Sequence, residues 1–258
     1  MRIVVTAGPT REYLDPVRFL SNPSTGKMGF AIAAEAARRG HDVTLIAGPV
    51  TLKTPKGVKR VDVVSAREML AAVRKSLLTS CCGDLSSEHR SIRPSDHLRN
   101  FTAFISTAAV ADWRPAKCAA KKLKKGEMSG VLKLVRNPDI LKTIARKVRG
   151  QRLRLTADSK NSIVQPSTFN LQPIYLVGFA AETNDVLKEA ARKCREKGLE
   201  FIVANDVTQK GCGFGMDTNR VTFVFPDGTM KKFPLMTKRA VAKRILDAVS
   251  SVATGREG

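Results

Sequence analysis

Short apolar runs alternate with segments of helical periodicity along most of the chain. The β-branched and aromatic runs predict strands at residues 3–5, 43–46, 61–64, 104–106, 131–135, 174–179 and 201–203. Small and apolar residues at helical spacing predict helices at residues 30–39, 68–73 and 183–197, from about 138, and from 237 onward. Two further runs, 221–225 and 231–233, flank Pro226-Asp227-Gly228 and predict a hairpin.

This alternation predicts a three-layer α/β/α fold with a mainly parallel, Rossmann-like sheet and a small β-hairpin or flap. A chain of 258 residues favours one domain, residues 1–258. Residues 79–100 and 151–172 lack periodicity and are expected to be loop insertions. Ligands bind such folds beyond the carboxyl ends of the strands, so residues 6–27, 108–125, 180–183 and 205–206 are expected to carry the chemistry.

Composition narrows the class of protein. An apolar content of 43% excludes wholesale disorder, and no run approaches the ~18 apolar residues of a membrane-spanning helix. The 5 cysteines are odd in number and irregularly spaced, which favours a reducing, cytoplasmic setting over a disulfide framework. No Cys-x-x-Cys pair is present, so a structural zinc site is not expected.

Positive charge is concentrated in the middle of the chain. The net charge is +22, and residues 113–154 hold fourteen basic residues against only Glu127 and Asp139. Such a segment attracts anions, although a solvated face is an equally good interpretation for its outer residues. Because Trp113 is its only aromatic residue, base stacking is poorly supported and small phosphorylated ligands are favoured over nucleic acid.

The segment S-N-P-S-T-G-K-M-G at residues 21–29 leads into the first long helix. Backbone N–H groups at a helix start, with glycine allowing close approach, make a phosphate or carboxylate site. It is not a Walker A loop, because Ser21 replaces the first glycine and Met28 replaces the magnesium-binding hydroxyl. An ordinary capped helix is the alternative interpretation.

Three other segments are candidates. Small residues before Asp112 would let a flat ring lie against the backbone, and the lysines at 121–125 would stabilise a reacting phosphoryl group. Residues 137–139 can start and cap a helix. Lys193 and Lys197 share one helix face, where lysines are usually just solvated.

The string TAGPTREYLDPVRFLSNPSTGKMGFAIAAEAARRG, together with AAVADWRPA, KKLKK, LVRNPDIL, VGFAAET and FIVANDV, resembles phosphopantothenoylcysteine synthetase. The resemblance covers nearly the whole chain apart from the two insertions. The form of residues 21–29 is similar to the bacterial, CTP-using branch, with Thr25 where a second serine is usual.

The resemblance implies a CTP-dependent phosphopantothenate–cysteine ligase of coenzyme A biosynthesis. CTP would activate 4′-phosphopantothenate as an acyl-cytidylate with release of pyrophosphate, and L-cysteine would displace CMP. Mg²⁺ is expected, with Asp112, Asp139 and Glu182 as candidate ligands and none assigned. Because the chain begins at the synthetase's first strand, a stand-alone enzyme without FMN is expected, with a separate decarboxylase as pathway neighbour. The family is typically homodimeric through the segment at residues 15–19.

The same resemblance assigns residue roles. Asn22 would hold the acyl-cytidylate and help its conversion, and Lys122, or Lys121 if the alignment slips, would stabilise charge at the reacting phosphate. Gly26 and Lys27 would complete the acyl-substrate side. The expected CTP-binding residues are Ser106, Asp112, Lys122, Asn137, Pro138, Asp139, Ile140, Phe179, Lys193 and Lys197.

Two other classes remain as alternatives. A nicotinamide-dependent oxidoreductase is disfavoured because the chain lacks both the G-x-G-x-x-G fingerprint and a Tyr-x-x-x-Lys pair. A basic nucleic-acid-binding protein would show a steep salt dependence of affinity. A degenerate synthetase that binds CTP without turnover is a residual possibility.

Overall fold

The computed structural model describes residues 1–78, 101–124, 130–158, 173–182, 185–206, 208–209 and 211–254. The helices are α1 (Lys27–Arg38), α2 (Ala66–Leu78), α3 (Ile140–Asp158), α4 (Val186–Lys197) and α5 (Lys238–Thr254). The strands are β1 (Arg2–Ala7), β2 (Arg11–Tyr13), β3 (Phe19–Ser21), β4 (Asp42–Ala47), β5 (Val58–Asp62), β6 (Thr102–Ser106), β7 (Trp113–Pro115), β8 (Leu134–Arg136), β9 (Ile174–Glu182), β10 (Phe201–Asp206), β11 (Thr218–Asn219), β12 (Val221–Val224), β13 (Met230–Lys232) and β14 (Met236–Thr237).

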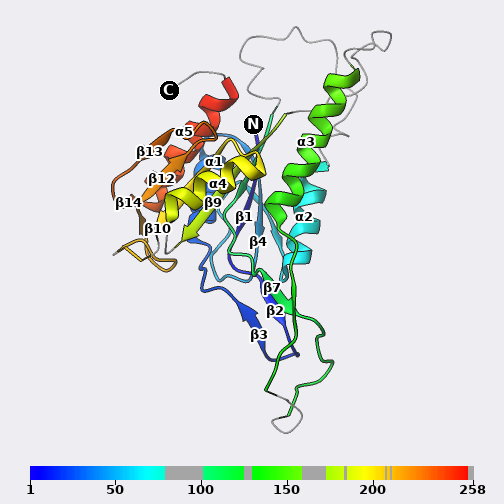
Figure 1. Ribbon diagram of the computed structural model, residues 1–258. Helices are drawn as coiled ribbons and strands as arrows, with labels where there is room; N and C mark the ends of the chain where they lie inside the picture. The colour runs from blue at the N-terminus through cyan, green and yellow to red at the C-terminus, as the bar shows by residue number, and fades with distance from the viewer. Residues whose placement is uncertain are drawn as a thin grey trace.

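Eight strands form the central sheet in the order β13-β12-β10-β9-β6-β1-β4-β5 (Figure 1). The six strands from β10 to β5 are parallel, while β12 and β13 are antiparallel additions at one edge. The β12–β13 pair is the hairpin that the sequence predicts around residues 226–228. The mainly parallel α/β fold is therefore confirmed.

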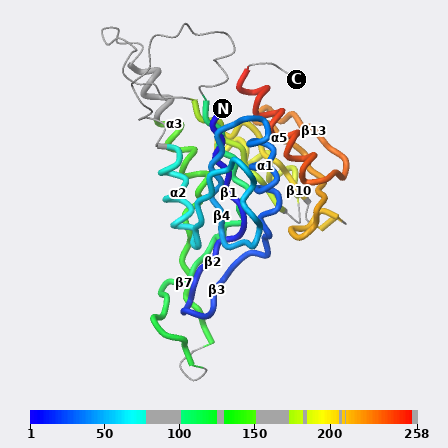
Figure 2. The backbone as a smooth tube through the Cα atoms, turned by 180° about the vertical axis from the view of Figure 1, so that it is seen from behind, coloured from blue at the N-terminus to red at the C-terminus, as the bar shows by residue number. Residues whose placement is uncertain are grey.

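Helices cover both faces of the sheet and make three layers. α1 and α5 pack on one face, together with Ile3 and Val5 of the central strand. α2, α3 and α4 pack on the other face with Val4, because successive residues of a strand point to opposite sides. Figure 2 shows α1 and α5 on one side of the strands and α2 and α3 on the other. No helix in the described part of the chain is long and apolar enough to cross a membrane.

Two small antiparallel pairs, β2–β3 and β7–β8, extend away from the sheet as an arm (Figures 1 and 2). The arm comprises residues 11–21, 113–124 and 130–136. The sequence did not predict β2, β3 or β7 as strands, because three-residue strands leave too few positions for an alternating pattern. At the base of the arm, the Arg136 guanidinium lies 5.3 Å from the centre of the Trp113 ring.

Some predicted boundaries are wrong. The strand predicted at 61–64 is β5, which starts earlier because Val58 pairs with Val43 in the sheet register. The strand predicted at 131–135 is β8, which begins at Leu134. The loop predicted at 151–172 is helical over its first eight residues, where Gln, Arg, Leu and Ala favour continuation of α3. Residues 79–100 and 159–172 lie outside the described residues.

Candidate active site

The carboxyl ends of the parallel strands meet along one edge of the sheet. Strand order reverses there between β1 and β6, since β4 and β5 follow on one side and β9 and β10 on the other. Such a switch point leaves a crevice in which ligands of open α/β sheets bind. Beyond the strand ends, Pro9 and Ala109 continue the parallel pairing across this crevice.

Asn22 is anchored at the switch point by hydrogen bonds to the chain that leaves β6. Its Nδ2 donates to the carbonyls of Ala109 and Val110, both at 3.2 Å. The preceding Ser21 Oγ donates to the Thr10 carbonyl at 2.8 Å, which ties the same segment to the chain that leaves β1. With both Nδ2 hydrogens positioned in this way, the Asn22 side chain bridges the two sides of the crevice.

The start of α1 lies beside Asn22 and has the features of an anion site. Gly26 adopts φ 78° and lies close to Gly8, where a side chain would have a Cβ only 3.3 Å from the Gly8 nitrogen. No side chain caps the helix start, so the N–H groups of its first turn are directed at the site. Lys27 donates from Nζ to the Gly215 carbonyl at 2.8 Å and pairs with Asp217 at 2.7 Å.

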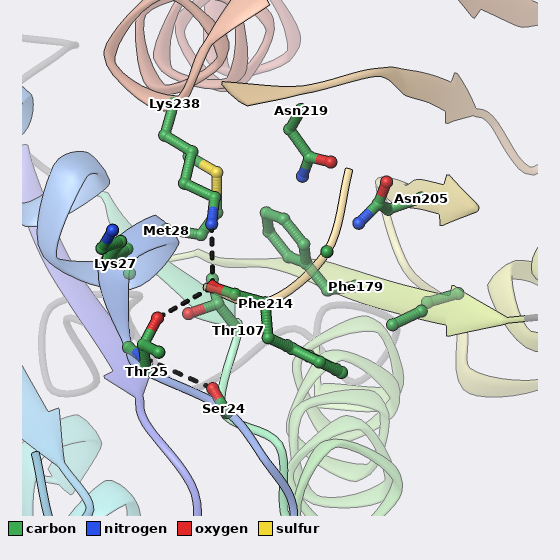
Figure 3. Close-up of a pocket in the computed structure, with 15 residues that line it drawn as sticks. Ser24, Thr25, Lys27, Met28, Thr107, Phe179, Asn205, Phe214, Asn219 and Lys238 are labelled. Atoms are coloured by element: carbon green, nitrogen blue, oxygen red, sulfur yellow. Dashed lines mark hydrogen bonds between the residues drawn. The ribbon is translucent and has the colours of Figure 1, made fainter. Parts of the chain in front are cut away.

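A pocket lies between this helix start and the ends of β6, β9 and β10 (Figure 3). Its lining residues come from seven segments: Ser24, Thr25, Gly26, Lys27, Met28, Gly29, Thr107, Phe179, Ala180, Ala181, Asn205, Gly213, Phe214, Asn219 and Lys238. The Phe214 carbonyl accepts hydrogen bonds from Thr25 Oγ1 at 2.8 Å and from Lys238 Nζ at 3.1 Å. These bonds hold the loop after β10 against α1 and so close one side of the pocket.

A second group of predicted residues gathers between α3 and α4, on the other face of the sheet. Asp139 caps α3, since its Oδ1 accepts from the Lys142 amide at 2.8 Å, and its Oδ2 pairs with Lys197 Nζ at 2.7 Å. Burial raises the pKa of the Asp139 carboxyl, but hydrogen bonds from Lys197 and the Lys142 amide outweigh burial and hold it below its usual value. Asn137 Nδ2 donates to the Ala111 carbonyl at 2.8 Å, which joins this group to the end of β6.

The structure thus unites some predicted residues and separates others. Asn137, Asp139 and Lys197 lie together, whereas Phe179 packs on the α1 side and lines the pocket beside Lys27. Asp112, on the exposed loop after β6, joins the second group through its backbone, because its carbonyl accepts from the Asn137 amide at 2.8 Å. Ser106 lies at the end of β6, Lys122 on the arm and Lys193 on α4. The alternative Lys121 is also exposed on the arm, beside a segment that Leu123 ties to Asp15.

Sequence reasoning missed Lys238, Asn219 and Phe214, which line the pocket. Lys238 carried a usable signal, because a lysine at the first position of a helix opposes the helix dipole and is unusual without an anionic partner. Asn219 and Phe214 carried none, since their roles depend on how the loop after β10 folds back.

Within the described ranges, no three His, Cys, Asp or Glu side chains lie close enough together to hold a metal ion. The exposed Asp112 and the paired Asp139 fit at most a Mg²⁺ whose other ligands are nucleotide phosphates and water.

Sequence comparisons relate the chain to a known protein family. Residues 1–81, 89–164 and 151–252 match the family described as DNA/pantothenate metabolism flavoprotein C-terminal domain. The coenzyme A biosynthesis bifunctional protein CoaBC of Escherichia coli is 42% identical over 96% of this chain, and the chain spans about half (51%) of that protein's length. The alternatives of an oxidoreductase and a nucleic-acid-binding protein gain no support from these relatives.

Solved structures give the same result. The crystal structure of the C-terminal domain of CoaBC has a TM-score of 0.68 and 35% identity, and the match covers 98% of this chain and 96% of that one. A Cab2 mutant in complex with phosphopantothenate-cysteine has a TM-score of 0.65 and covers 99% of this chain and 88% of that one, but its 14% identity shows the fold alone. The resemblance to phosphopantothenoylcysteine synthetase is confirmed, and the chain belongs to the DNA/pantothenate metabolism flavoprotein C-terminal domain family.

Proposed function

We propose that the chain is a phosphopantothenate–cysteine ligase that uses CTP. The observation that carries this proposal is the position of Asn22, fixed at the switch point between an anion-binding helix start and the α3–α4 group. A ligase of this kind must hold a nucleotide and an acyl phosphate on either side of one reacting carbon. The start of α1 and the α3–α4 group flank one crevice and provide two separate polar sites, as that reaction requires.

In the first step, a carboxylate oxygen of 4′-phosphopantothenate attacks the α-phosphorus of CTP, and pyrophosphate leaves. The nucleotide is assigned to Ser106, Asp112, Lys122, Phe179 and Lys193, together with the group at residues 137–140 and Lys197. Lys122 lies on the exposed arm. Cations there stabilise the charge that develops on the transferring phosphoryl group. Mg²⁺ would neutralise charge on the nucleotide phosphates.

In the second step, the cysteine amine forms a bond to the acyl carbon, the carbon–oxygen bond to the phosphate breaks, and CMP leaves while the amine loses a proton. Asn22 holds the acyl-cytidylate in the crevice, and Gly26 and Lys27 bind its pantothenoyl side. The amide of Asn22 carries no charge, so it positions the intermediate without attracting the leaving phosphate to a fixed cation.

The homodimer belongs to the same proposal, with the arm as its interface. Large apolar side chains are exposed there, including Val17 at 57%, Phe19 at 38% and Trp113 at 45% exposure. Exposed apolar clusters of this kind mark protein–protein contacts. Independence from FMN stays a prediction.

Pyrophosphate release tests the proposal. Purified protein is incubated with 4′-phosphopantothenate, Mg²⁺ and either CTP or ATP, with and without L-cysteine. Sustained release that needs CTP and cysteine is expected, and Asn22→Ala is expected to stop after about one turnover because the acyl-cytidylate accumulates. Preference for ATP would overturn the choice of nucleotide, and no release with either nucleotide would overturn the ligase.

A further inference from the structure

The layer formed by α2, α3 and α4 carries exposed cations that the fold does not pair. The net charge of the chain is +22, and the candidate active site accounts for only part of that charge. Exposed cations of this layer that form no ion pair among the described residues are Arg67, Arg74, Lys142, Arg146, Lys147, Arg149, Lys188 and Arg195. Their charge is therefore available to a partner.

Carboxylates of the same layer are occupied by contacts within the chain. Glu68 accepts a hydrogen bond from Ser65 Oγ at 2.9 Å at the start of α2. Glu189 and Glu196 share Arg192 of the same helix, with ion-pair distances of 2.8 and 2.7 Å. Because these carboxylates are already paired or hydrogen-bonded, the charge that this face leaves for a partner is positive.

Three of these cations form a stripe along α3. Lys142, Arg146 and Arg149 are separated by four and three residues, so they lie on one face of the helix. The sequence places no carboxylate on α3 between residues 140 and 150. Like charges at this spacing destabilise a helix, so helix stability does not explain the stripe. Binding of an anion would offset the repulsion.

The stripe lines a groove between α3 and α4, which lie next to each other in Figure 1. Lys142, Arg146 and Arg149 line the groove from α3, and Lys197 lines it from α4. Among its described lining residues the one carboxylate is Glu196, which an arginine of α4 already neutralises. The groove shares no lining residue with the pocket at the start of α1, which lies on the other face of the sheet.

The composition of the three helices indicates which anion fits. Among the described residues, no large apolar side chain of α2, α3 or α4 is exposed, whereas a protein partner would bury an apolar centre. No aromatic residue belongs to these helices, so unpaired bases would find no ring on which to stack. The phosphate backbone of a duplex needs neither feature, because lysine and arginine bind it through charge.

We propose that the outer surface of α2, α3 and α4, centred on the groove, binds duplex nucleic acid through its phosphates without sequence preference. This activity is separate from the ligase and does not rest on it. The sequence favours small phosphorylated ligands because the basic segment has one aromatic residue, but that shortage disfavours base stacking and leaves contacts with phosphates unaffected.

Fluorescence anisotropy with labelled DNA duplexes over a range of salt concentrations tests the proposal. Wild-type protein should bind two duplexes of unrelated sequence equally, with a Kd between about 10⁻⁶ and 10⁻⁴ M at physiological salt. Arg146→Gln/Arg149→Gln should weaken binding and reduce the slope of log K against log salt concentration by about 2, one for each lost phosphate contact. Arg239→Gln/Arg244→Gln removes the same charge from exposed positions of α5 on the opposite face, and should leave the slope unchanged.

Four outcomes would overturn the proposal. Wild-type protein that binds no duplex at physiological salt would exclude the activity, and equal losses in the two double variants would assign binding to total charge instead of this surface. Tighter binding of single-stranded poly(dT) would replace the duplex by unpaired bases, and equal affinity for polyglutamate would replace nucleic acid by an acidic protein chain. Far-UV circular dichroism and the urea midpoint of each variant should match the wild type, so that a loss of binding reports on the surface and not on folding.

Discussion

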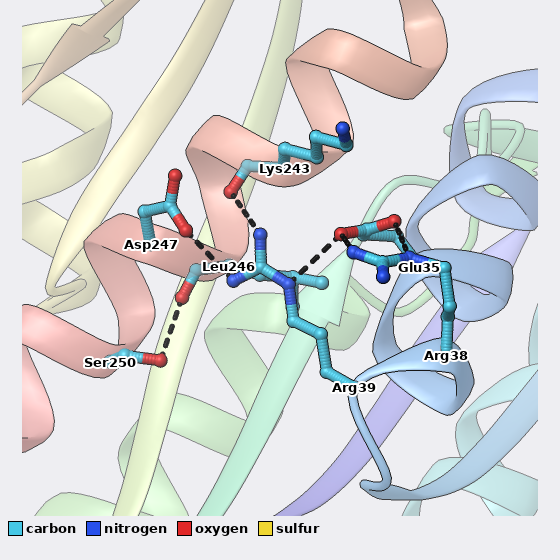
Figure 4. A network of polar contacts seen from close by, with 7 residues as sticks. All are labelled: Glu35, Arg38, Arg39, Lys243, Leu246, Asp247 and Ser250. Atoms are coloured by element: carbon cyan, nitrogen blue, oxygen red, sulfur yellow. Dashed lines mark hydrogen bonds and ion pairs between the residues drawn. The ribbon is translucent and has the colours of Figure 1, made fainter.

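The two ends of α1 use polar groups in opposite ways. At its C-terminal end, Glu35 is almost fully buried and accepts hydrogen bonds from Arg38 at 2.7 and 2.8 Å and from Arg39 at 3.0 Å (Figure 4). Arg39 in turn pairs with Asp247 at 2.8 Å and donates to the Lys243 carbonyl, which ties α1 to α5. At its N-terminal end, the helix start has no side-chain cap and faces a pocket with two amide oxygens that have no hydrogen-bond partner among the described residues.

This difference separates groups that hold the fold from groups that await a ligand. The hydrogen bonds from Arg38, and after them those from Arg39, outweigh burial and lower the pKa of Glu35 to about 2, so the carboxylate is charged and satisfied within the chain. Buried polar groups in native proteins are normally satisfied in this way. The Oδ1 atoms of Asn205 and Asn219 at the other end face the pocket, whereas the Nε2 atom of His41, which also has no partner among the described residues, lies beside positive charges at the C-terminal end.

The largest effect on stability is expected from Gly29→Ala, at the open end of α1. A Cβ there would lie 2.5 Å from the Ala7 Cβ and 2.6 Å from Thr107 Oγ1, so the helix must move off β1. Overpacking of this kind should reduce the free energy of unfolding by roughly 3 kcal/mol, measured by urea denaturation. Gly150→Ala is the control, because nothing lies within 4 Å of its Cβ and alanine favours a helix. Equal stability of the two variants would contradict the close packing of α1 on β1.

Glu35→Gln tests the C-terminal end of α1, where arginine side chains satisfy the buried carboxylate. Loss of the charge that Arg38 and Arg39 share should reduce the free energy of unfolding by about 2 kcal/mol, as expected for hydrogen bonds to a charged group. The folded-state pKa lies below the ordinary 4.5, so the wild-type contribution is complete above pH 4.5 and is lost as pH falls toward 2. Thermal denaturation of both proteins at several pH values measures this loss of stability. The variant should lack the part of the decrease between pH 4.5 and 2 that Glu35 causes in the wild type. Cysteine-dependent turnover should survive in folded variant protein.

His41 follows the same helix end and should give a smaller, pH-dependent effect. Burial, and then the positive charges of the N-terminus and Arg39, lower its pKa to about 4. The unfolded chain therefore binds a proton first, and stability falls as pH drops from 6.5 toward 4. His41→Gln should flatten this part of the stability profile. An NMR titration that places the pKa of His41 near 6.5 would refute its burial.

The smallest stability change is expected for Asp217→Asn, at the open end. Its partner Lys27 is one-third exposed and Asp217 itself is 86% exposed, so water screens the ion pair and its loss should change the free energy of unfolding little. Turnover is expected to fall more than stability, because Lys27 would no longer be held at the helix start. A variant with lower stability and normal turnover would assign the pair to the fold instead of the site.

The sequence by itself determined the layered fold and many of the residues that form the candidate site. Periodicity located most strands and helices, and Thr237 caps α5 as predicted, since its Oγ1 accepts from the Ala240 amide at 3.2 Å. The pattern also marked the helix start at Gly26 and the capping Asp139, because local rules govern turns and helix ends. These features depend on neighbours within a few residues, which the sequence alone displays.

Only the tertiary structure decided which of these groups meet. Asp139 and Lys197 are far apart in the chain, and the packing of α3 beside α4 makes them a pair. Phe179, expected beside them, lies on the opposite side because the alternation of β9 turns it toward α1. Lys238, Asn205 and Asn219 converge on one pocket through the fold-back of the loop after β10. Long-range convergence of this kind depends on packing and register, and no local pattern in the sequence records it.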